Sequence, residues 1–153
     1  MRVYLLVVLC VLIGAGGSAG QTAAQLQDVK KIYVDTLGDD TGASAIRNGI
    51  RNALAKSDRF EVVESADQAD AVLSGEGHVT ETKEAPLGSP KHRKTRTKYH
   101  AVASVQLKGK DQALLWSKDD AYESISNKAS SILGHEIAMK LVKAATPKED
   151  KKK

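Results

Sequence analysis

Four histidines are the side chains of this sequence best suited to bind a metal ion. They are His78, His92, His100 and His135. His78 and His100 lie in two segments that are expected to pair as strands, and this pairing could bring the two rings near each other. Two ligands do not complete a zinc site, and nothing in the sequence holds Glu76 or Glu81 beside them. The sequence therefore predicts no metal site.

Paired carboxylates are a second arrangement that could support catalysis. They occur at Asp39 and Asp40, at Asp67 and Asp70, and at Asp119 and Asp120. Acid–base catalysis requires two carboxyl groups held in a pocket with pKa values shifted apart. These pairs fall in expected turns and at the ends of expected elements, where aspartate caps backbone N–H groups. The serines lack the spacing of a nucleophile elbow, and no phosphate-binding glycine loop is present. The sequence therefore predicts no enzyme and no cofactor.

The N-terminus has the features of a secretory signal peptide over residues 1–20. Arg2 is followed by an unbroken apolar run from Val3 to Ile13 and then by small residues up to Gly20. A positive start, a short apolar stretch and a small-residue zone are typical of a cleaved export signal. The run is shorter than the roughly 20 residues that span a bilayer. We expect cleavage near residues 19–20 and a periplasmic or secreted mature protein.

Cys10 is the only cysteine of the chain. A bacterial lipoprotein has a small residue directly before the cysteine that receives the lipid, whereas Leu9 precedes Cys10. Cys10 also lies inside the apolar run rather than at its end. The sequence therefore predicts that the protein is not a lipoprotein, and that the mature chain has no disulfide and no thiolate metal site.

Positive charge is concentrated in one internal segment and in the C-terminal tail. Residues 83–98 contain six Lys or Arg and one Glu, although the net charge of the whole chain is only +4. This segment also contains two prolines and a single large apolar residue, Leu87. Because it cannot form a core, we expect a mobile basic loop at 83–98 and a disordered charged tail at 147–153.

The residues with the clearest interaction character lie at the end of this basic loop. They are Lys91, His92, Arg93, Lys94, Arg96, Lys98 and Tyr99. Such a cluster could attract phosphate, lipid headgroups or an anionic polymer. With Tyr99 as the only adjacent aromatic residue, it lacks a platform on which bases could stack, so nucleic acid is not expected. The charges are equally consistent with a solvated loop that keeps an extended hairpin soluble.

Hydrophobic patterning predicts a single α/β domain over residues 30–146, after a polar linker at 21–29. Strands are expected at 30–34, 60–63, 71–82, 99–108 and 113–121, and helices at 43–56 and 124–145. The order is β-α-β-β-β-β-α. It predicts an α+β two-layer fold, in which a small mixed sheet of four to five strands carries two helices.

Several residues carry more detailed expectations about packing. Ile46, Ile50 and Leu54 lie on one stripe of the first helix, and Gly49 is expected to let this helix sit close to the sheet. The second helix is expected to begin near Ser124, whose hydroxyl would cap it, with Ile125 on its apolar stripe.

Two further expectations concern the strands. Gly75 and Gly77 predict a bulge or a close backbone approach in the third strand. Trp116 is expected to fill the core against one of the helices.

Four short segments carry a resemblance to a known family. They are Lys31-Ile-Tyr-Val34, Ala53 to Glu64 with its Arg59-Phe-Glu-Val-Val-Glu64 motif, Ala69-Asp-Ala-Val-Leu-Ser-Gly-Glu-Gly77, and Val105 to Ser117 with its Leu115-Trp pair. Over about residues 30–145 the chain resembles an envelope family that includes the accessory domain of the curli-secretion channel CsgG, the penicillin-binding-protein activator LpoB and the N-terminal domain of TolB. The resemblance implies a periplasmic or outer-membrane-facing module that binds other proteins without a cofactor. Residues 78–98 are too basic and too rich in proline for the membrane hairpins of a secretion channel.

The favoured prediction is therefore an exported non-catalytic binding module, a periplasmic adaptor or assembly factor of the cell envelope. Its partner would be an envelope protein, bound at an exposed sheet edge or at the hairpin of residues 78–98. An alternative is an electrostatic binder of anionic polymer or membrane surface through Lys91 to Lys98, and a third is a hydrolase with an unrecognised site. The oligomeric state stays open.

Overall fold

The computed structural model describes residues 25–84 and 95–147 of the 153-residue chain. A helical turn at 25–28 precedes the sheet, and Leu26 and Val29 are buried in the core, so the polar linker predicted at 21–29 is wrong from residue 25 onward. The elements that follow are β1 (Lys31–Val34), α2 (Thr41–Lys56), β2 (Glu61–Val63), η1 (Ala66–Gln68), β3 (Ala71–Glu84), β4 (Arg96–Gly109), β5 (Leu114–Ser124) and α3 (Ala129–Ala145). This order confirms the predicted two-layer fold class. The expected signal peptide, Cys10 and most of the charged tail lie outside the described residues.

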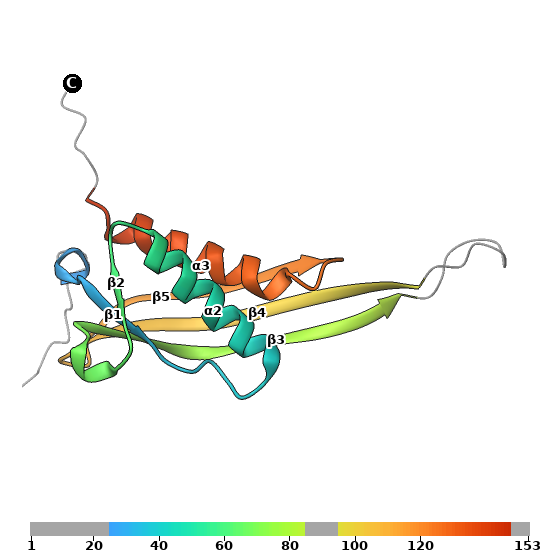
Figure 1. The fold of residues 1–153 in the computed structure, drawn as a ribbon, viewed down its shortest axis with the longest axis horizontal. Helices are drawn as coiled ribbons and strands as arrows, with labels where there is room; N and C mark the ends of the chain where they lie inside the picture. The colour runs from blue at the N-terminus through green and yellow to red at the C-terminus, as the bar shows by residue number, and fades with distance from the viewer. Residues whose placement is uncertain (1–24, 85–94, 148–153) are drawn as a thin grey trace, which may run out of the picture.

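The five strands form one mixed sheet in the order β2-β1-β3-β4-β5. β1 pairs in parallel with both β2 and β3, whereas β3 with β4 and β4 with β5 are antiparallel pairs. Figure 1 shows α2 and α3 side by side over one face of this sheet. No helix of the described residues covers the opposite face of β3, β4 and β5, and we call it the open face.

The core lies between the sheet and the two helices. Ile46, Ile50 and Leu54 are fully buried, which confirms the apolar stripe predicted for α2. Alternate residues of β4 from Ala101 to Leu107 are buried beneath the helices, as the strand period requires. Trp116 is partly buried against this cluster, in agreement with its expected place in the core.

Gly49 allows α2 to approach the other helix rather than the sheet, so the predicted role of this residue is wrong. A Cβ atom on Gly49 would lie 2.8 Å from the carbonyl oxygen of Ser131, and one on Gly134 would lie 2.3 Å from the carbonyl oxygen of Ile46 in α2. Both distances are shorter than a Cβ contact tolerates. The two glycines therefore set the close packing of α2 against α3.

Gly75 confirms the predicted close backbone approach. Its φ of +155° is a conformation that other residues rarely adopt, and a Cβ there would lie 2.8 Å from the Cα atom of Val105. The register between β3 and β4 is continuous through this position, so the alternative of a bulge does not occur.

The second helix begins five residues later than predicted. Ser124 is the last residue of β5, where it pairs with Tyr99, and α3 starts at Ala129. The Ser124 hydroxyl accepts a hydrogen bond from the N–H of Ser126 at 3.1 Å, so it stabilises a turn and caps no helix. Ile125, expected on the apolar stripe, is 64% exposed. The strand continues because β4 offers it a backbone partner, which side-chain periodicity does not reveal.

The predicted loop at 83–98 is wrong at both ends. Lys83 and Glu84 pair with Thr97 and Arg96 as the last steps of a long antiparallel ladder. Figure 1 shows this two-stranded extension projecting beyond both helices, and we call residues 80–84 and 96–100 the hairpin arm. Beyond Tyr99, which still pairs with β5 and packs against the core, the backbone hydrogen bonds continue without a core beneath them. Residues 85–94 lie outside the described residues.

Candidate interaction surface

The structure divides the predicted interaction residues between three places. Lys91, His92, Arg93 and Lys94 lie outside the described residues. Along β4, Arg96 and Lys98 alternate with Tyr99. The side chains of Arg96 and Lys98 therefore lie on one face of the arm, and that of Tyr99 lies on the other. Tyr99 is partly buried and packs against the core on the helix side. Arg96, Lys98 and Tyr99 therefore do not form one contact patch.

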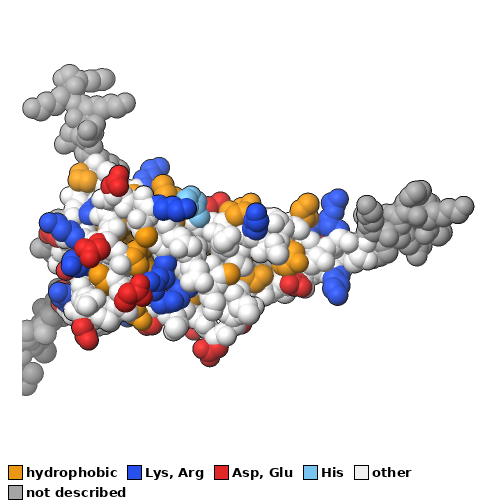
Figure 2. Space-filling view, in the orientation of Figure 1, with side chains coloured by type: hydrophobic (Ala, Val, Ile, Leu, Met, Phe, Trp, Pro, Cys, Tyr) orange, Lys and Arg blue, Asp and Glu red, His pale blue; other side chains and the backbone are white. Residues whose placement is uncertain are grey.

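Lys98 is already held by acidic neighbours on the arm. Its Nζ atom lies 2.6 Å from Glu84 and 3.6 Å from Glu123. The hydrogen bond to Glu84, with the charges of Glu84 and Glu123, raises the pKa of Lys98 above its ordinary value. The ammonium group is thus protonated at neutral pH and its charge is compensated within the chain. Figure 2 shows further basic side chains along the narrow arm, and acidic and basic side chains interspersed over the body.

The open face contains a shallow hollow of about 550 Å³. Its lining includes Glu76, His78, Val102, Ser104, Asp119 and Ala121. The Ser104 hydroxyl donates to the Asp119 carboxylate at 2.5 Å across neighbouring strands. An apolar floor with a few hydrogen-bonded polar groups is compatible with binding a partner surface.

The two strand histidines reach the same face, as expected. His78 pairs with Val102 and His100 with Thr80, which places the rings diagonally across neighbouring strands. His100 lies 4.0 Å from Glu123. Within residues 25–84 and 95–147, no three His, Cys, Asp or Glu side chains gather as a metal-binding group.

Several carboxylates of these pairs make hydrogen bonds or an ion pair within the chain. Asp40 accepts a hydrogen bond from the N–H of Ala43 at 2.6 Å and caps α2, as predicted. Asp119 and Asp120 do not lie at an element end, contrary to the prediction, because β5 runs on past them. Strand alternation sends Asp119 to Ser104 on the open face and Asp120 to Lys140 of α3 on the other.

Asp70 secures the start of β1. Its carboxylate accepts hydrogen bonds from the N–H groups of Lys31 at 2.9 Å and Lys30 at 3.2 Å. The hydrogen bond from Lys31 is the main cause that lowers the pKa of Asp70 below its ordinary value of 3.8, against the opposing effect of burial. This carboxylate is therefore structural.

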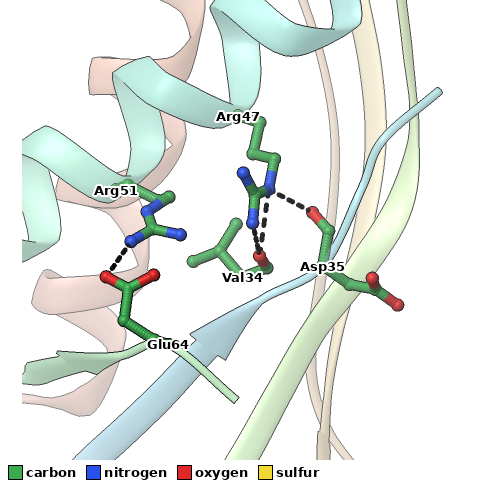
Figure 3. A network of polar contacts seen from close by, with 5 residues as sticks. All are labelled: Val34, Asp35, Arg47, Arg51 and Glu64. Carbon is green, nitrogen blue, oxygen red and sulfur yellow. Dashed lines mark hydrogen bonds and ion pairs between the residues drawn. The ribbon is translucent and has the colours of Figure 1, made fainter. Parts of the chain in front are cut away.

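Two arginines of α2 tie the helix to the sheet. Figure 3 shows the Arg47 guanidinium donating to the carbonyl oxygens of Val34 and Asp35, at distances of 2.9 to 3.1 Å, and Arg51 pairing with Glu64 at 2.5 Å. Arg47 thereby satisfies carbonyl groups at the point where β1 ends. The Arg47 guanidinium is thus engaged by backbone carbonyl groups, which gives this residue a structural role.

Arg59 joins three distant segments and was missed by the sequence reasoning. Its guanidinium donates to the carbonyl oxygens of Gln27 at 2.6 Å, Val29 at 2.9 Å and Ala145 at 3.4 Å. These carbonyls lie at and after the helical turn at 25–28, and at the C-terminus of α3. No local pattern marks such a residue, because all its partners are carbonyls of segments about 30 or more residues away.

Besides the short outer strand β2, the described sheet has free edges on β5 and on the outer part of β3, and these two differ in character. β5 is an outer strand of 11 residues, and its middle reads Ser-Lys-Asp-Asp from Ser117 to Asp120. The N–H of Ala121 is taken by the side chain of Asp120 at 3.2 Å. Charges on an outer strand oppose pairing with another chain. The exposed edge that the sequence predicts as a contact surface is thus interrupted on β5.

The outer edge of β3 is open along the arm. β1 pairs with β3 only as far as Leu73, and the N–H of Gly77 then bonds to the carbonyl oxygen of Leu37 on the same side. Because strand residues alternate, Glu81 and Lys83 direct their N–H and C=O groups to that side as well. No described strand lies beside them there.

None of the helices in the described ranges is long and apolar enough to cross a membrane.

Comparison with known proteins identifies a solved structure that shares the fold of this chain. No family model and no curated protein matches the chain. Among solved structures, the dodecamer of a PelC variant from Paraburkholderia phytofirmans superposes with a TM-score of 0.53 at 17% identity, covering 78% of this chain and 88% of that chain. This likeness shows that the two proteins share a fold.

Two further structures superpose less closely. A candidate lipoprotein of Caulobacter crescentus gives a TM-score of 0.46 at 11% identity, covering 80% of this chain and 93% of that one. A minor lipoprotein of Acinetobacter baumannii gives 0.44 at 12% identity, covering 74% and 88%. The predicted absence of lipid from Cys10 is untested by these likenesses, and the resemblance to the CsgG, LpoB and TolB family stays a prediction beyond the fold.

Proposed function

We propose that this chain is an exported, non-catalytic protein of the cell envelope that binds another protein through the hairpin arm. The observation that carries the proposal is the open outer edge of β3 at Glu81 and Lys83. A strand of the partner would add to this edge by backbone hydrogen bonds, a common mode of peptide recognition.

The persistence of the arm supports this function. Beyond Tyr99, where β5 ends, the arm is a two-stranded ribbon without a packed face, which is only marginally stable in water. Thr80 to Lys83 are exposed. The arm therefore contributes little to the stability of the body, yet Lys98 bridges Glu84 of β3 and Glu123 of β5 to hold it in place. A segment that is ordered without helping the core is suited to contact a partner.

The shared fold with PelC is compatible with this proposal, since that protein was solved as a dodecamer. Assembly with copies of this chain is one form that protein binding could take. Export to the periplasm rests on the signal-like residues 1–20.

The deciding experiment places a proline on the open edge. Lys83→Pro removes one outward N–H group and obstructs strand addition, whereas the control Lys83→Ala removes the side chain and keeps that group. A photo-activated crosslinker at Thr82 should capture one defined envelope protein in the wild type and in the control. The same crosslinker at exposed Asn52 of α2 should not.

Loss of this capture in Lys83→Pro, with an unchanged circular-dichroism melting curve, is the expected result. Equal capture in both variants would exclude strand addition at this edge. Capture that instead disappears above about 0.3 M salt in wild type and both variants would favour the electrostatic alternative, because screening weakens exposed charge contacts.

A further inference from the structure

A second hollow, of about 310 Å³, lies where the hairpin arm leaves the body. One wall is the start of α2 with Asp40 and Thr41, and another is the helix-facing side of the arm with Glu81 and Tyr99. The third wall is the approach to α3 and its first turn, with Asn127 and Ser130. The N-termini of both helices therefore meet at this hollow.

The two helices begin differently. α2 is capped by Asp40, whereas α3 has Lys128 at its N-cap position, no side-chain capping bond and no acidic residue in its first turn. Among the described residues, no acceptor bonds to the N–H groups of Ser130 and Ser131. Free N–H groups at the positive end of a helix favour an oxyanion.

Ser130 gives independent evidence for a ligand at this helix end. It is 6% exposed, and it is the one polar residue that is buried in the described ranges. No hydrogen-bond partner of its hydroxyl lies in the described ranges. Every fully enclosed side-chain oxygen of the described residues does have a partner, so the Ser130 oxygen is not fully enclosed. The Ser130 oxygen must therefore reach open space, and the hollow that Ser130 lines provides it.

The charges around the hollow have both signs. A simple anion at the start of α3 would face the carboxylates of Asp40 and Glu81. A simple cation beside those carboxylates would face the positive end of α3. A ligand that carries both charges, separated by a few bonds, avoids both conflicts.

We propose that this hollow binds a small zwitterion, an α-amino acid or a dipeptide. Its carboxylate accepts hydrogen bonds from the N–H group and the hydroxyl of Ser130, which lines the hollow. Its ammonium group lies toward Asp40 and Glu81, and Val79 and Tyr99 provide an apolar wall for its side chain. The volume is at the lower end of the range for ligand pockets, which suits a ligand of this size. Glu81 lends its side chain to this site and its backbone to the strand edge of the proposed function, but ligand binding here does not depend on strand addition.

The test titrates the mature chain calorimetrically with alanyl-alanine and two blocked analogues. The N-acetylated dipeptide lacks the ammonium group, and the dipeptide amide lacks the carboxylate. We expect saturable binding of alanyl-alanine and affinities weaker by about tenfold or more for each analogue. Absence of saturation up to about 10 mM, or equal affinity for a blocked analogue, would overturn the proposal.

A matched pair of serine variants separates binding from folding. Ser130→Ala removes the unpartnered hydroxyl, and we expect alanyl-alanine to bind about fivefold more weakly while the melting temperature stays the same or rises. Ser131→Ala is the control, because that hydroxyl donates to the carbonyl of Lys128 at 3.0 Å, and binding should not change. Equal affinity in both variants would contradict the role assigned to Ser130.

Discussion

Single polar side chains hold distant backbone segments of this molecule together, and Asp70 is the clearest acidic case. Its ionised form accepts two backbone N–H groups, which is why its pKa lies below the ordinary 3.8. A carboxylate whose pKa is lowered in the folded state stabilises the protein at pH values above its ordinary pKa. This contribution is lost as the pH falls through the folded-state pKa.

We therefore expect Asp70→Ala to lower the free energy of unfolding by about 1 kcal/mol at pH 7, a discounted figure for a partly exposed carboxylate. The gap to wild type should shrink as the pH falls below about 3.8, where the unfolded chain binds its proton, toward the lower folded-state pKa of Asp70. Urea unfolding at pH 7 and pH 3 measures both values. A gap of equal size at the two pH values would mean that the charge of Asp70 is unimportant.

Arg59 makes the corresponding prediction for a cation. Arg59→Lys keeps the charge but loses the planar fork that reaches several carbonyls, so we expect a loss of about 1–2 kcal/mol. Faster amide hydrogen exchange at 25–29 should accompany it, because Arg59 holds the carbonyls of Gln27 and Val29.

Arg51→Lys is the matched control for that experiment. Arg51 pairs with a Glu64 side chain that is 79% exposed, and such a pair contributes about 0.5 kcal/mol or less. Similar losses in the two lysine variants would contradict the role assigned to the Arg59 fork.

At the scale of elements, the contact between α2 and α3 decides what a methyl group does at Gly49. In an exposed helix, Gly→Ala stabilises by about 1 kcal/mol. Here a Cβ would lie 2.8 Å from the Ser131 carbonyl oxygen of the facing helix. We expect Gly49→Ala to destabilise the protein by about 1–3 kcal/mol, since overpacking forces the helices apart.

The control for this prediction is Asn52→Ala, at an exposed position of the same helix. It should change the free energy of unfolding by no more than about 0.5 kcal/mol. Chemical denaturation of both variants measures the difference. A stabilised Gly49→Ala protein would show that the two helices are not in close contact.

At the scale of the whole molecule, the outer strand β5 presents an edge at which another copy of the chain would pair. Asp120 holds the outward N–H of Ala121 and pairs with Lys140, so Asp120→Ala would free that edge position. We expect the average mass of Asp120→Ala to rise more steeply with concentration than that of wild type, because an open strand edge invites pairing.

Sedimentation velocity over a range of concentrations measures this effect. Asp119→Ala is the control, since Asp119 lies on the open face and bonds to Ser104. Identical behaviour of the two variants would mean that Asp120 does not protect the edge.

Local patterns in the sequence were sufficient for the order of elements and for much of the core. The stripe of Ile46, Ile50 and Leu54 and the alternation from Ala101 to Leu107 each repeat within one element, so they identify the buried face without knowledge of its partner. The capping role of Asp40 is likewise local, because the N–H that it accepts is three residues away.

The candidate surfaces depended on partners that are remote in sequence, and only the tertiary structure could supply them. The Lys98 ion pairs join three strands, and the hollow at the arm joins two helix ends to β3 and β4. The late start of α3 follows from the pairing of Ser124 with Tyr99. The apolar faces can be predicted from periodicity alone, since burial follows it. Which polar groups are left without partners depends on the tertiary fold, because a backbone or side-chain hydrogen bond can be satisfied from anywhere in the chain.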